Sequence, residues 1–248
     1  MIEAEIEDAI GRVVLNSPAN HNALDRQAMD ALMRVFEDWT TRSDLRALIL
    51  TGTGRSFCSG AALGEVTRAD WTEDRLTALC DALEAFPAPT VARLNGGVYG
   101  GGMELALSCD FRVGVKGMRA FAPPARFGIH YAPAGLARVI DRLGPQVARR
   151  VFLLGETFDD ASLLHHGFLD RLVAPDELDS VTDWIAETLA AAAPLAIQGM
   201  KQSIVELSRG AHDDAAADRR IATCIASADH AEGMAARREK RKPRFTGT

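Results

Sequence analysis

Short apolar runs alternate with amphipathic segments along the first two thirds of this 248-residue chain. Strands are predicted where such runs are bounded by turn residues or proline, at residues 10–15, 46–51, 90–94 and 111–115. Residues 25–39 and 76–86 place apolar side chains at helical spacing. Strands separated by helices pair in parallel through right-handed crossovers. The sequence therefore predicts an α/β fold, and periodicity alone also allows a doubly wound sheet.

The last third of the chain is predicted to be mostly helical. From residue 136 onward we expect helices, with one short strand at 169–173, a helix over 178–193 and a polar helical tail after Pro194. The helix at 25–39 has an apolar stripe that predicts a core-facing side, formed by Met29, Leu32, Met33, Phe36 and Trp39. We expect one core with a C-terminal appendage.

A glycine cluster at residues 95–102 leads into a helix with a single carboxylate, Glu104. Glycines leave backbone N–H groups unshielded, and those at a helix start lack intrahelical acceptors, so they can donate to an anionic oxygen. A carboxylate on an otherwise apolar helix needs a partner, and this role is either structural, as an ion pair or cap, or that of an acid/base.

A second segment of small residues follows the predicted strand at 46–51. It comprises residues 52–63, and its sequence is GTGRSFCSGAAL. Such a loop lets a ligand lie against bare backbone. The loop lacks the third glycine of a dinucleotide fingerprint, because Phe57 stands there, and the chain has no P-loop lysine and no Gly-x-Ser-x-Gly motif.

These two segments resemble the signature pair of the enoyl-CoA hydratase/isomerase (crotonase) superfamily. Residues 22–24 also resemble the family's early CoA-contacting turn, and residues 232–245 its C-terminal signature, so the likeness spans the chain. It implies a crotonase-like spiral of ββα units with a C-terminal helical region. Residues 1–193 would form the core with the acyl-CoA site, and residues 194–248 would supply oligomer contacts and part of the CoA pocket. Trimers or dimers of trimers are expected.

The same resemblance implies roles for individual residues. The N–H groups of Ala61 and Gly101 would bind the thioester oxygen, and Glu104 matches the family's first catalytic glutamate. Substrate or CoA contacts are expected at Asn22, Ala23, Leu24, Ser59, Ala61, Leu63, Gly101 and Lys242. Residues 66–71, Phe127 and Tyr131 are expected to set the pocket depth. The resemblance implies no cofactor other than the coenzyme A of the substrate.

The sequence departs from the family pattern at two positions, and the first of them affects the expected reaction. The second catalytic glutamate falls at Pro124, which exchanges no proton, and Ala62 replaces a common aspartate. Tyr131 lies in a context similar to the methylmalonyl-CoA decarboxylase branch, although a structural tyrosine is an equal alternative, and the neighbouring His130 is expected to be structural. We rank four functions in order of expectation. An enoyl-CoA hydratase or isomerase comes first and a decarboxylase or other CoA lyase second. A catalytically silent acyl-CoA binder is third, and an RNA-binding protein is last.

Composition limits the remaining classes. A net charge of −6 argues against nonspecific nucleic-acid binding, and no apolar run reaches membrane-spanning length. The acidic start lacks the pattern of a signal peptide, so a cytoplasmic protein is expected. The four cysteines show no paired spacing and predict reduced thiols rather than disulfides. The neighbours His165 and His166 should point apart on a helix, so we expect surface histidines and no metal site.

Overall fold

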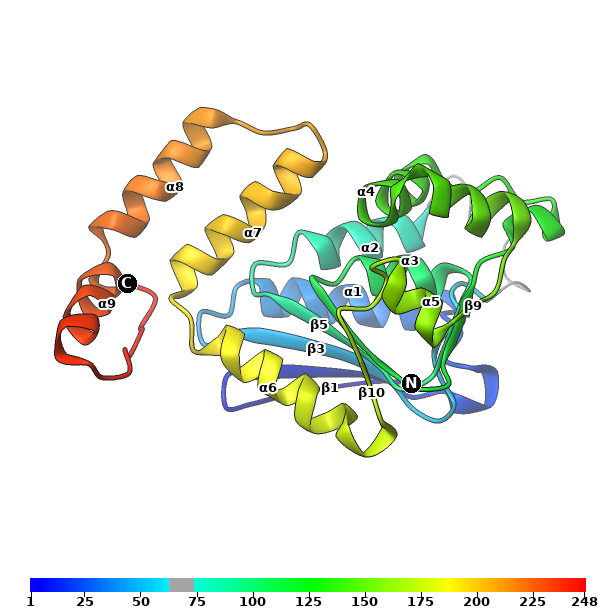
Figure 1. Ribbon diagram of the computed structural model, residues 1–248, viewed down its shortest axis with the longest axis horizontal. Helices are drawn as coiled ribbons and strands as arrows, with labels where there is room; N and C mark the ends of the chain where they lie inside the picture. The colour runs from blue at the N-terminus through cyan, green and yellow to red at the C-terminus, as the bar shows by residue number, and fades with distance from the viewer. Residues whose placement is uncertain (63–73) are drawn as a thin grey trace.

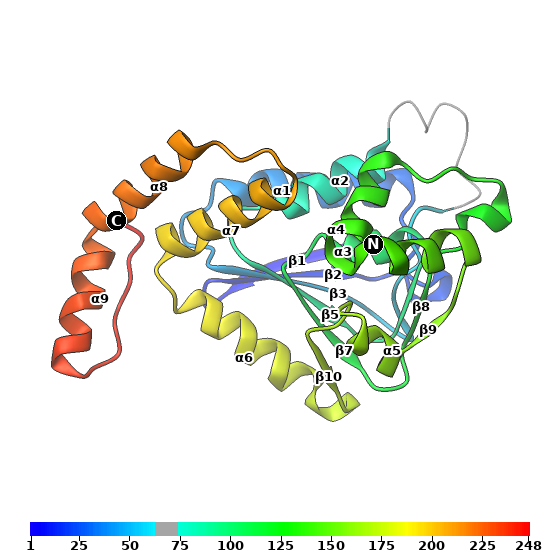
Figure 2. The ribbon, with the colours of Figure 1, turned by 45° about the horizontal axis from the view of Figure 1, so that its top comes forward.

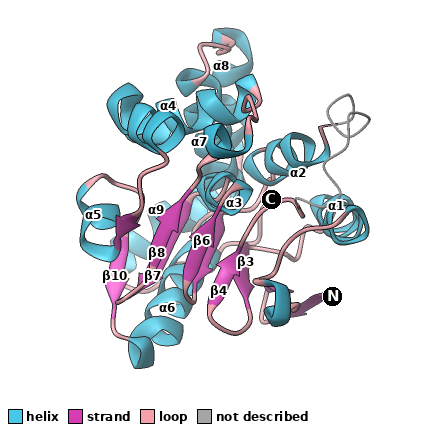
Figure 3. Ribbon diagram, turned by 90° about the vertical axis from the view of Figure 1, so that its right-hand side faces the viewer, coloured by secondary structure: helices cyan, strands magenta, loops and turns pink. Residues whose placement is uncertain are grey.

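The computed structural model of the chain describes residues 1–62 and 74–248. Within these residues the strands form two sheets, with helices on both sides (Figure 3). The six-stranded sheet has the order β1-β2-β3-β5-β7-β10 and the four-stranded sheet the order β4-β6-β8-β9. The strands are β1 (Ile2–Glu7), β2 (Ile10–Leu15), β3 (Ala47–Gly52), β4 (Ser56–Cys58), β5 (Thr90–Leu94), β6 (Gly97–Tyr99), β7 (Phe111–Val115), β8 (Arg119–Phe121), β9 (Phe158–Asp159) and β10 (Arg171–Val173).

The helices follow the predicted pattern. They are α1 (Arg26–Thr40), α2 (Arg75–Glu84), α3 (Gly101–Leu107), α4 (Pro133–Arg149), α5 (Asp160–His165), α6 (Leu178–Ala190), α7 (Pro194–Ser208), α8 (Asp214–Ala226) and α9 (Ala228–Glu239). Asp25 caps α1 by accepting from the Ala28 N–H, which explains why the helix starts there. Non-helical backbone at Gly144 divides α4 in two.

Parallel pairing dominates, as the alternation of strands and helices predicts. Antiparallel pairs occur only at the ends of the described sheets, between β1 and β2 and between β8 and β9. The strand β1 was not predicted, because its acidic side chains hide a simple hairpin. Asp8 and Ala9 form its two-residue turn, and both have positive φ (47° and 68°), as a tight hairpin requires.

The core lies between the six-stranded sheet and its helices. Strand β3 is central and almost wholly buried, with Leu48, Ile49 and Leu50 at 0% exposure. Helix α6 lies on one side of this sheet and helices α1 and α2 on the other (Figures 1 and 2). Both views place α8 and α9 at the opposite end of the molecule from α4. Helix α7 begins at Pro194, and the division of the chain at residue 193 stays a prediction.

Candidate active site

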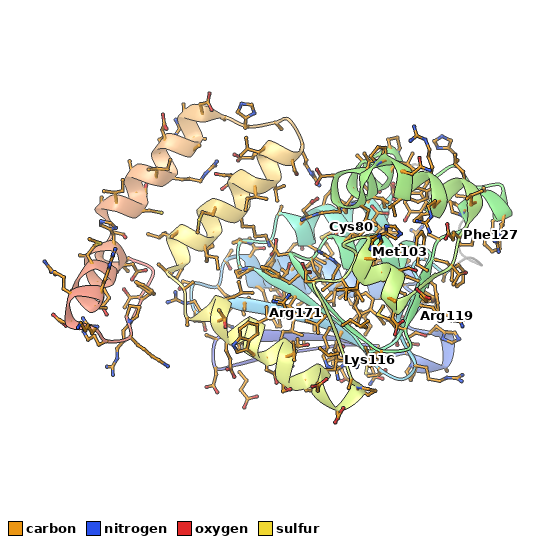
Figure 4. The ribbon with its side chains drawn as sticks, in the orientation of Figure 1. Cys80, Met103, Lys116, Arg119, Phe127 and Arg171 are labelled. Carbon is orange, nitrogen blue, oxygen red and sulfur yellow. The ribbon has the colours of Figure 1, made fainter. Side chains whose placement is uncertain are left out.

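A cavity of about 450 Å³ lies between the start of α3, the start of α2 and the segment before α4. Its apolar wall is formed by Leu24, Met29, Leu76, Phe121, Ala122, Pro123, Pro124, Phe127 and Ile129. The predicted core stripe of α1 is confirmed, because Leu32 and Phe36 are buried and Met29, Met33 and Trp39 pack against the core; Met29 also lines the cavity. Figure 4 shows Phe127 at the outer edge of the molecule, where it is 59% exposed and forms part of the rim.

The glycine cluster and the small-residue loop meet at this cavity. Gly100 has φ of 51° and precedes the first helical residue of α3, Gly101. A Cβ on Gly60 would overlap the backbone nitrogen of Gly101, and a Cβ on Gly101 would lie 3.6 Å from the nitrogen of Ala61. The two backbone segments can approach this closely only because residue 60 is glycine, while a Cβ on Gly101 would instead overlap the side chain of Leu76.

The backbone of Ala61 is oriented by a bridge to Leu24. The Leu24 N–H donates to the Gly60 carbonyl at 2.8 Å, and the Ala62 N–H donates to the Leu24 carbonyl at 3.0 Å. In such a parallel bridge the N–H of the middle residue points away from the partner strand. The N–H of Gly101, at the first helical position, has no intrahelical acceptor. Both Ala61 and Gly101 line the cavity, so a ligand there lies next to both backbone segments.

Glu104 lies in the first turn of α3 and also lines the cavity, although only 2% of its side chain is exposed. Its Oε1 accepts a hydrogen bond from Nη1 of Arg138 at 2.5 Å, and its Oε2 accepts one from the Tyr131 hydroxyl at 2.8 Å. Burial raises the pKa of Glu104, while Arg138 and the Tyr131 hydroxyl pull that pKa down. Glu104 therefore has the ion pair expected of a buried structural carboxylate, and it also lines the cavity, as an acid/base would.

Tyr131 is held against Glu104 by the packing of α4. Its ring lies 4.8 Å from that of Phe152, centroid to centroid. A Cβ on Gly135 would strike the Tyr131 ring and lie 2.7 Å from Oε2 of Glu104, so a larger residue at position 135 would displace the pair. Burial, and then the Glu104 carboxylate, raise the pKa of Tyr131, so that its hydroxyl stays a neutral donor.

The position of the missing second glutamate is apolar in the structure. Pro124 lines the cavity beside Pro123, and among the described residues the only lining carboxylates are Glu104 and Asp74. Asp74 caps α2 by accepting from the N–H and the hydroxyl of Thr77, at 3.1 and 2.5 Å. The sequence reasoning missed both Asp74 and Arg138. Arg138 was detectable as a charged residue on the buried face of α4, at helical spacing from Gly135 and next to Val139.

The other predicted contact residues separate into two groups. Leu24 and Ser59 line the cavity. Ala23 does not line it, and neither does Asn22, whose amide holds the small-residue loop by donating to the carbonyls of Thr53, Ser56 and Phe57 at 2.8–3.1 Å. Leu63 and the predicted depth-setting residues 66–71 lie outside the described residues. His130 is exposed.

Lys242, the remaining predicted CoA contact, follows α9. The views in Figures 1 and 2 agree that α9 lies at the far end of the molecule from α3 and α4, which border the cavity. Lys242 is not among the residues that line the cavity of its own chain. Its neighbour Arg241 pairs with Glu232 and Glu239, each at 2.6 Å, so that the segment after α9 is folded back on that helix.

The cysteines and histidines behave largely as expected. All four cysteines are free, and three of them are buried; burial raises the pKa of Cys58 and of Cys109 to about 12. The expectation that His165 and His166 point apart is wrong, because their ring centroids are only 4.9 Å apart at the end of α5. No cluster of three metal-binding side chains occurs in the described part of the chain. No helix in residues 1–62 and 74–248 has the length and apolar character needed to cross a membrane.

Comparison with known proteins identifies the class to which this fold and cavity belong. The enoyl-CoA hydratase/isomerase family profile matches residues 5–248. A probable enoyl-CoA hydratase of Mycobacterium tuberculosis is 33% identical over 250 residues, 100% of both chains. The 2,3-dehydroadipyl-CoA hydratase of Escherichia coli is 30% identical over 240 residues, covering 95% of this chain and 94% of that protein.

Solved structures agree with the sequence relatives. An enoyl-CoA hydratase/carnithine racemase from Magnetospirillum magneticum superposes with a TM-score of 0.94 and 30% identity, over 100% of this chain and 96% of that one. The fold is therefore the crotonase fold. The chain belongs to the enoyl-CoA hydratase/isomerase family.

Proposed function

We propose that this protein moves a proton on an acyl-CoA thioester through an enolate, with the N–H groups of Ala61 and Gly101 at the thioester oxygen. Negative charge develops on that oxygen when a proton leaves the α-carbon, so two fixed donors stabilise the transition state more than the neutral substrate. Glu104 exchanges the proton. The coenzyme A is part of the substrate, and no further cofactor enters the proposed reaction.

The observation that supports this proposal most strongly is the placement of Glu104. One cavity contains the two residues with free N–H groups and a buried carboxylate whose two oxygens are each fixed by one donor, Arg138 or Tyr131. A general base needs this combination of reach and fixed orientation. A carboxylate oxygen has two lone pairs, so each one that accepts a protein hydrogen bond can still accept a substrate proton.

Among the family's reactions, Pro124 favours a shift of a double bond over the addition of water. In a shift, Glu104 removes a proton from C2 of a 3-enoyl-CoA and returns it to C4, so one carboxylate completes the cycle. Hydration needs a second group to activate water. The second carboxylate at the cavity, Asp74, is engaged as the cap of α2. We therefore place double-bond isomerisation first and hydration second.

The test is turnover of 2-enoyl-, 3-enoyl- and malonyl-type CoA thioesters, followed by mass spectrometry in deuterated water. Hydration adds the mass of one deuterated water, a double-bond shift adds none and gives an isomer that chromatography separates, and we expect Glu104→Gln to lower either rate by about 10²–10⁴-fold. Glu206→Gln is the matched control, because Glu206 is an ion-paired carboxylate on α7, outside the cavity. Acyl-CoA binding without turnover of any thioester would refute the proposal and leave a silent binder.

A second candidate function is decarboxylation of a malonyl-type CoA thioester. The Tyr131 hydroxyl at 2.8 Å from Glu104 favours it, because loss of carbon dioxide forms an enolate that needs a proton donor rather than a base. In that reaction the bond to the carboxylate carbon breaks, its electrons enter the enolate, and the Tyr131 hydroxyl protonates the α-carbon. Release of carbon dioxide that survives Glu104→Gln and fails in Tyr131→Phe would select this candidate.

We infer a homo-oligomer, a trimer or a dimer of trimers, from the C-terminal helices. Large apolar side chains are exposed on these helices, at Met200, Ile204, Leu207, Ile221, Ile225 and Met234. Exposed apolar surface of this kind favours burial against another copy. Since Lys242 does not line its own cavity, we propose that it contributes to the CoA pocket of a neighbouring copy. Truncation after Ala193 should lower the number of copies per particle, and an unchanged number would contradict this assembly.

A further inference from the structure

Arg138 connects the candidate catalytic carboxylate to helix α2. Its side chain is only 1% exposed. Nη1 donates to Oε1 of Glu104 at 2.5 Å, and Nη2 donates to Oδ1 of Asp81 at 2.6 Å. Nε and Nη2 also approach Oε2 of Glu84, at 3.4 and 3.3 Å. A planar guanidinium with five fixed donors can make these contacts at once, whereas an ammonium group cannot reproduce the fork.

The two carboxylates on α2 have cations of their own. Arg209, at the end of α7, contacts Glu84 and lies 3.4 Å from Asp81. Arg142, one turn after Arg138 on α4, lies 3.6 Å from Glu84. Among the described residues, Arg138 is the only cation in hydrogen-bond contact with Glu104. Asp81 and Glu84 are therefore also neutralised by other arginines, whereas Glu104 pairs with Arg138.

We propose that Arg138 is a positioning residue for Glu104, which fixes the rotation of the carboxylate toward the cavity and keeps it ionised and able to accept a proton. This inference rests on the proposed function of Glu104. Arg138 holds Oε1 and the Tyr131 hydroxyl holds Oε2, so each carboxylate oxygen has one fixed donor, and both Glu104 and Tyr131 line the cavity. A base whose position is fixed before the substrate arrives requires no reorganisation during the reaction.

The charged and polar groups around Glu104 determine in which direction the loss of Arg138 would move the pKa of Glu104. Besides Arg138, the groups facing Glu104 are Tyr131 from the segment before α4, Asp74 at the N-cap of α2, and Cys80 and Asp81 on α2. Burial and the two aspartates raise the Glu104 pKa; Arg138 and Tyr131 lower it. Cys80 on α2 and Met103 on α3, both labelled in Figure 4, are buried, and such apolar surroundings disfavour an unpaired carboxylate. Without Arg138, the pKa of Glu104 would be higher, so Glu104 would stay protonated up to a higher pH.

The experiment measures the protonation of Glu104 in two independent ways. The first is the pH profile of kcat/KM for the thioester that wild type turns over. The second is the infrared carboxyl band that disappears in Glu104→Gln, titrated without substrate. In Arg138→Gln we expect the acidic limb and the band midpoint to move to higher pH by about one unit or more, which is a tenfold loss of kcat/KM on that limb. The effect should lie in kcat, with KM nearly unchanged.

Two further variants make the result decisive. Arg142→Gln is the matched control, because Arg142 lies on the same helix and contacts Glu84 but not Glu104, and it should move neither readout. Arg138→Lys keeps the charge but loses the fork, so we expect a smaller shift in the same direction. If Arg138→Gln does not fold, the lysine variant decides the question.

The outcomes separate this inference from the proposed function. Midpoints of the Glu104 band that stay at the wild-type pH in folded Arg138→Gln, or in Arg138→Lys, overturn the role of Arg138. A shifted band in a protein that turns over no thioester supports the role of Arg138 and overturns the proposed reaction instead. A shift of equal size in Arg142→Gln also overturns the role, because the effect would then belong to the charge of α4 as a whole.

Discussion

The core and the C-terminal helices place the same kind of ion pair in opposite surroundings. In the core, the side chains of Glu104 and Arg138 are 2% and 1% exposed. At the end of α9, those of Glu232 and Arg241 are 23% and 41% exposed. The contact distances are similar, 2.5 and 2.6 Å. The two pairs therefore differ strongly in burial and hardly in contact distance.

The pKa values of the two glutamates are shifted in opposite directions. Hydrogen bonds from Arg241 and from the Arg244 N–H lower the pKa of Glu232 to about 2. Burial outweighs Arg138 and Tyr131 and raises the pKa of Glu104. An exposed pair keeps its hydration and only gains attraction, whereas a buried pair first loses its hydration. The comparison teaches that, of these two glutamates, only the one from which the core removes water has a raised pKa despite its salt bridge.

Removal of a buried cation from the core should give the largest loss of stability. Arg112 is 5% exposed and donates to the carbonyls of Phe168 and Cys109 and to the Asp170 carboxylate. We expect Arg112→Ala to lower the free energy of unfolding by about 3–5 kcal/mol, measured by urea denaturation. Arg171→Ala is the control, because Arg171 is exposed and donates only to the Asp170 carbonyl among the described contacts. Equal losses in both variants would break the contrast between buried and exposed charges.

A methyl group where the small-residue loop meets the start of α3 should disrupt the proposed oxyanion site while leaving the charges intact. Gly60 has φ of 78°, and a Cβ there would overlap the nitrogen of Gly101. Gly60→Ala should therefore cost about 2.7–4 kcal/mol in the barrier, or about 10²–10³-fold in kcat. Gly117→Ala is the control, with φ of 86° and no atom within 4 Å of the added carbon. Undiminished turnover in Gly60→Ala would exclude these N–H groups from the reaction.

The pH dependence of stability should reveal the buried glutamate. Because the pKa of Glu104 is raised on folding, the unfolded chain ionises first as the pH rises above the usual value of 4.5. The native state then holds more protons, so the contribution of Glu104 to stability is lost as the pH rises from there through its native pKa. The difference in unfolding free energy between wild type and Glu104→Gln should decrease over that window. A difference that grows with pH would show that the ion pair outweighs burial.

The exposed pair should give the smallest effect, with the opposite sign. The pKa of Glu232 is lowered, so its contribution is present above the usual 4.5 and is lost as the pH falls toward about 2. Arg241→Gln should cost little stability, and salt should screen that cost because the groups are exposed. Thermal unfolding at low and high salt measures it. A salt-independent loss would mean that this pair is buried in the assembled protein.

Local sequence predicted much of the fold. Strands β2, β5 and β7 have the predicted bounds, and helix α1 starts where Asp25 provides a cap. These elements depend on periodicity, caps and prolines, which act between neighbours in the chain. The short strands β4, β6, β8 and β9 were not predicted, because segments of two or three residues become strands only when another strand lies beside them.

For the candidate site, the sequence determined the chemical groups and the tertiary structure decided their partners. The glycine cluster, Glu104, Tyr131 and Pro124 could be recognised from residue type and family resemblance. The ion pair between Glu104 and Arg138 joins residues 34 positions apart, and the bond from Tyr131 joins residues 27 positions apart. Such contacts, and the burial that sets the pKa of Glu104, arise only when α2, α3 and α4 pack together, since desolvation is a property of the whole surrounding and not of any one residue.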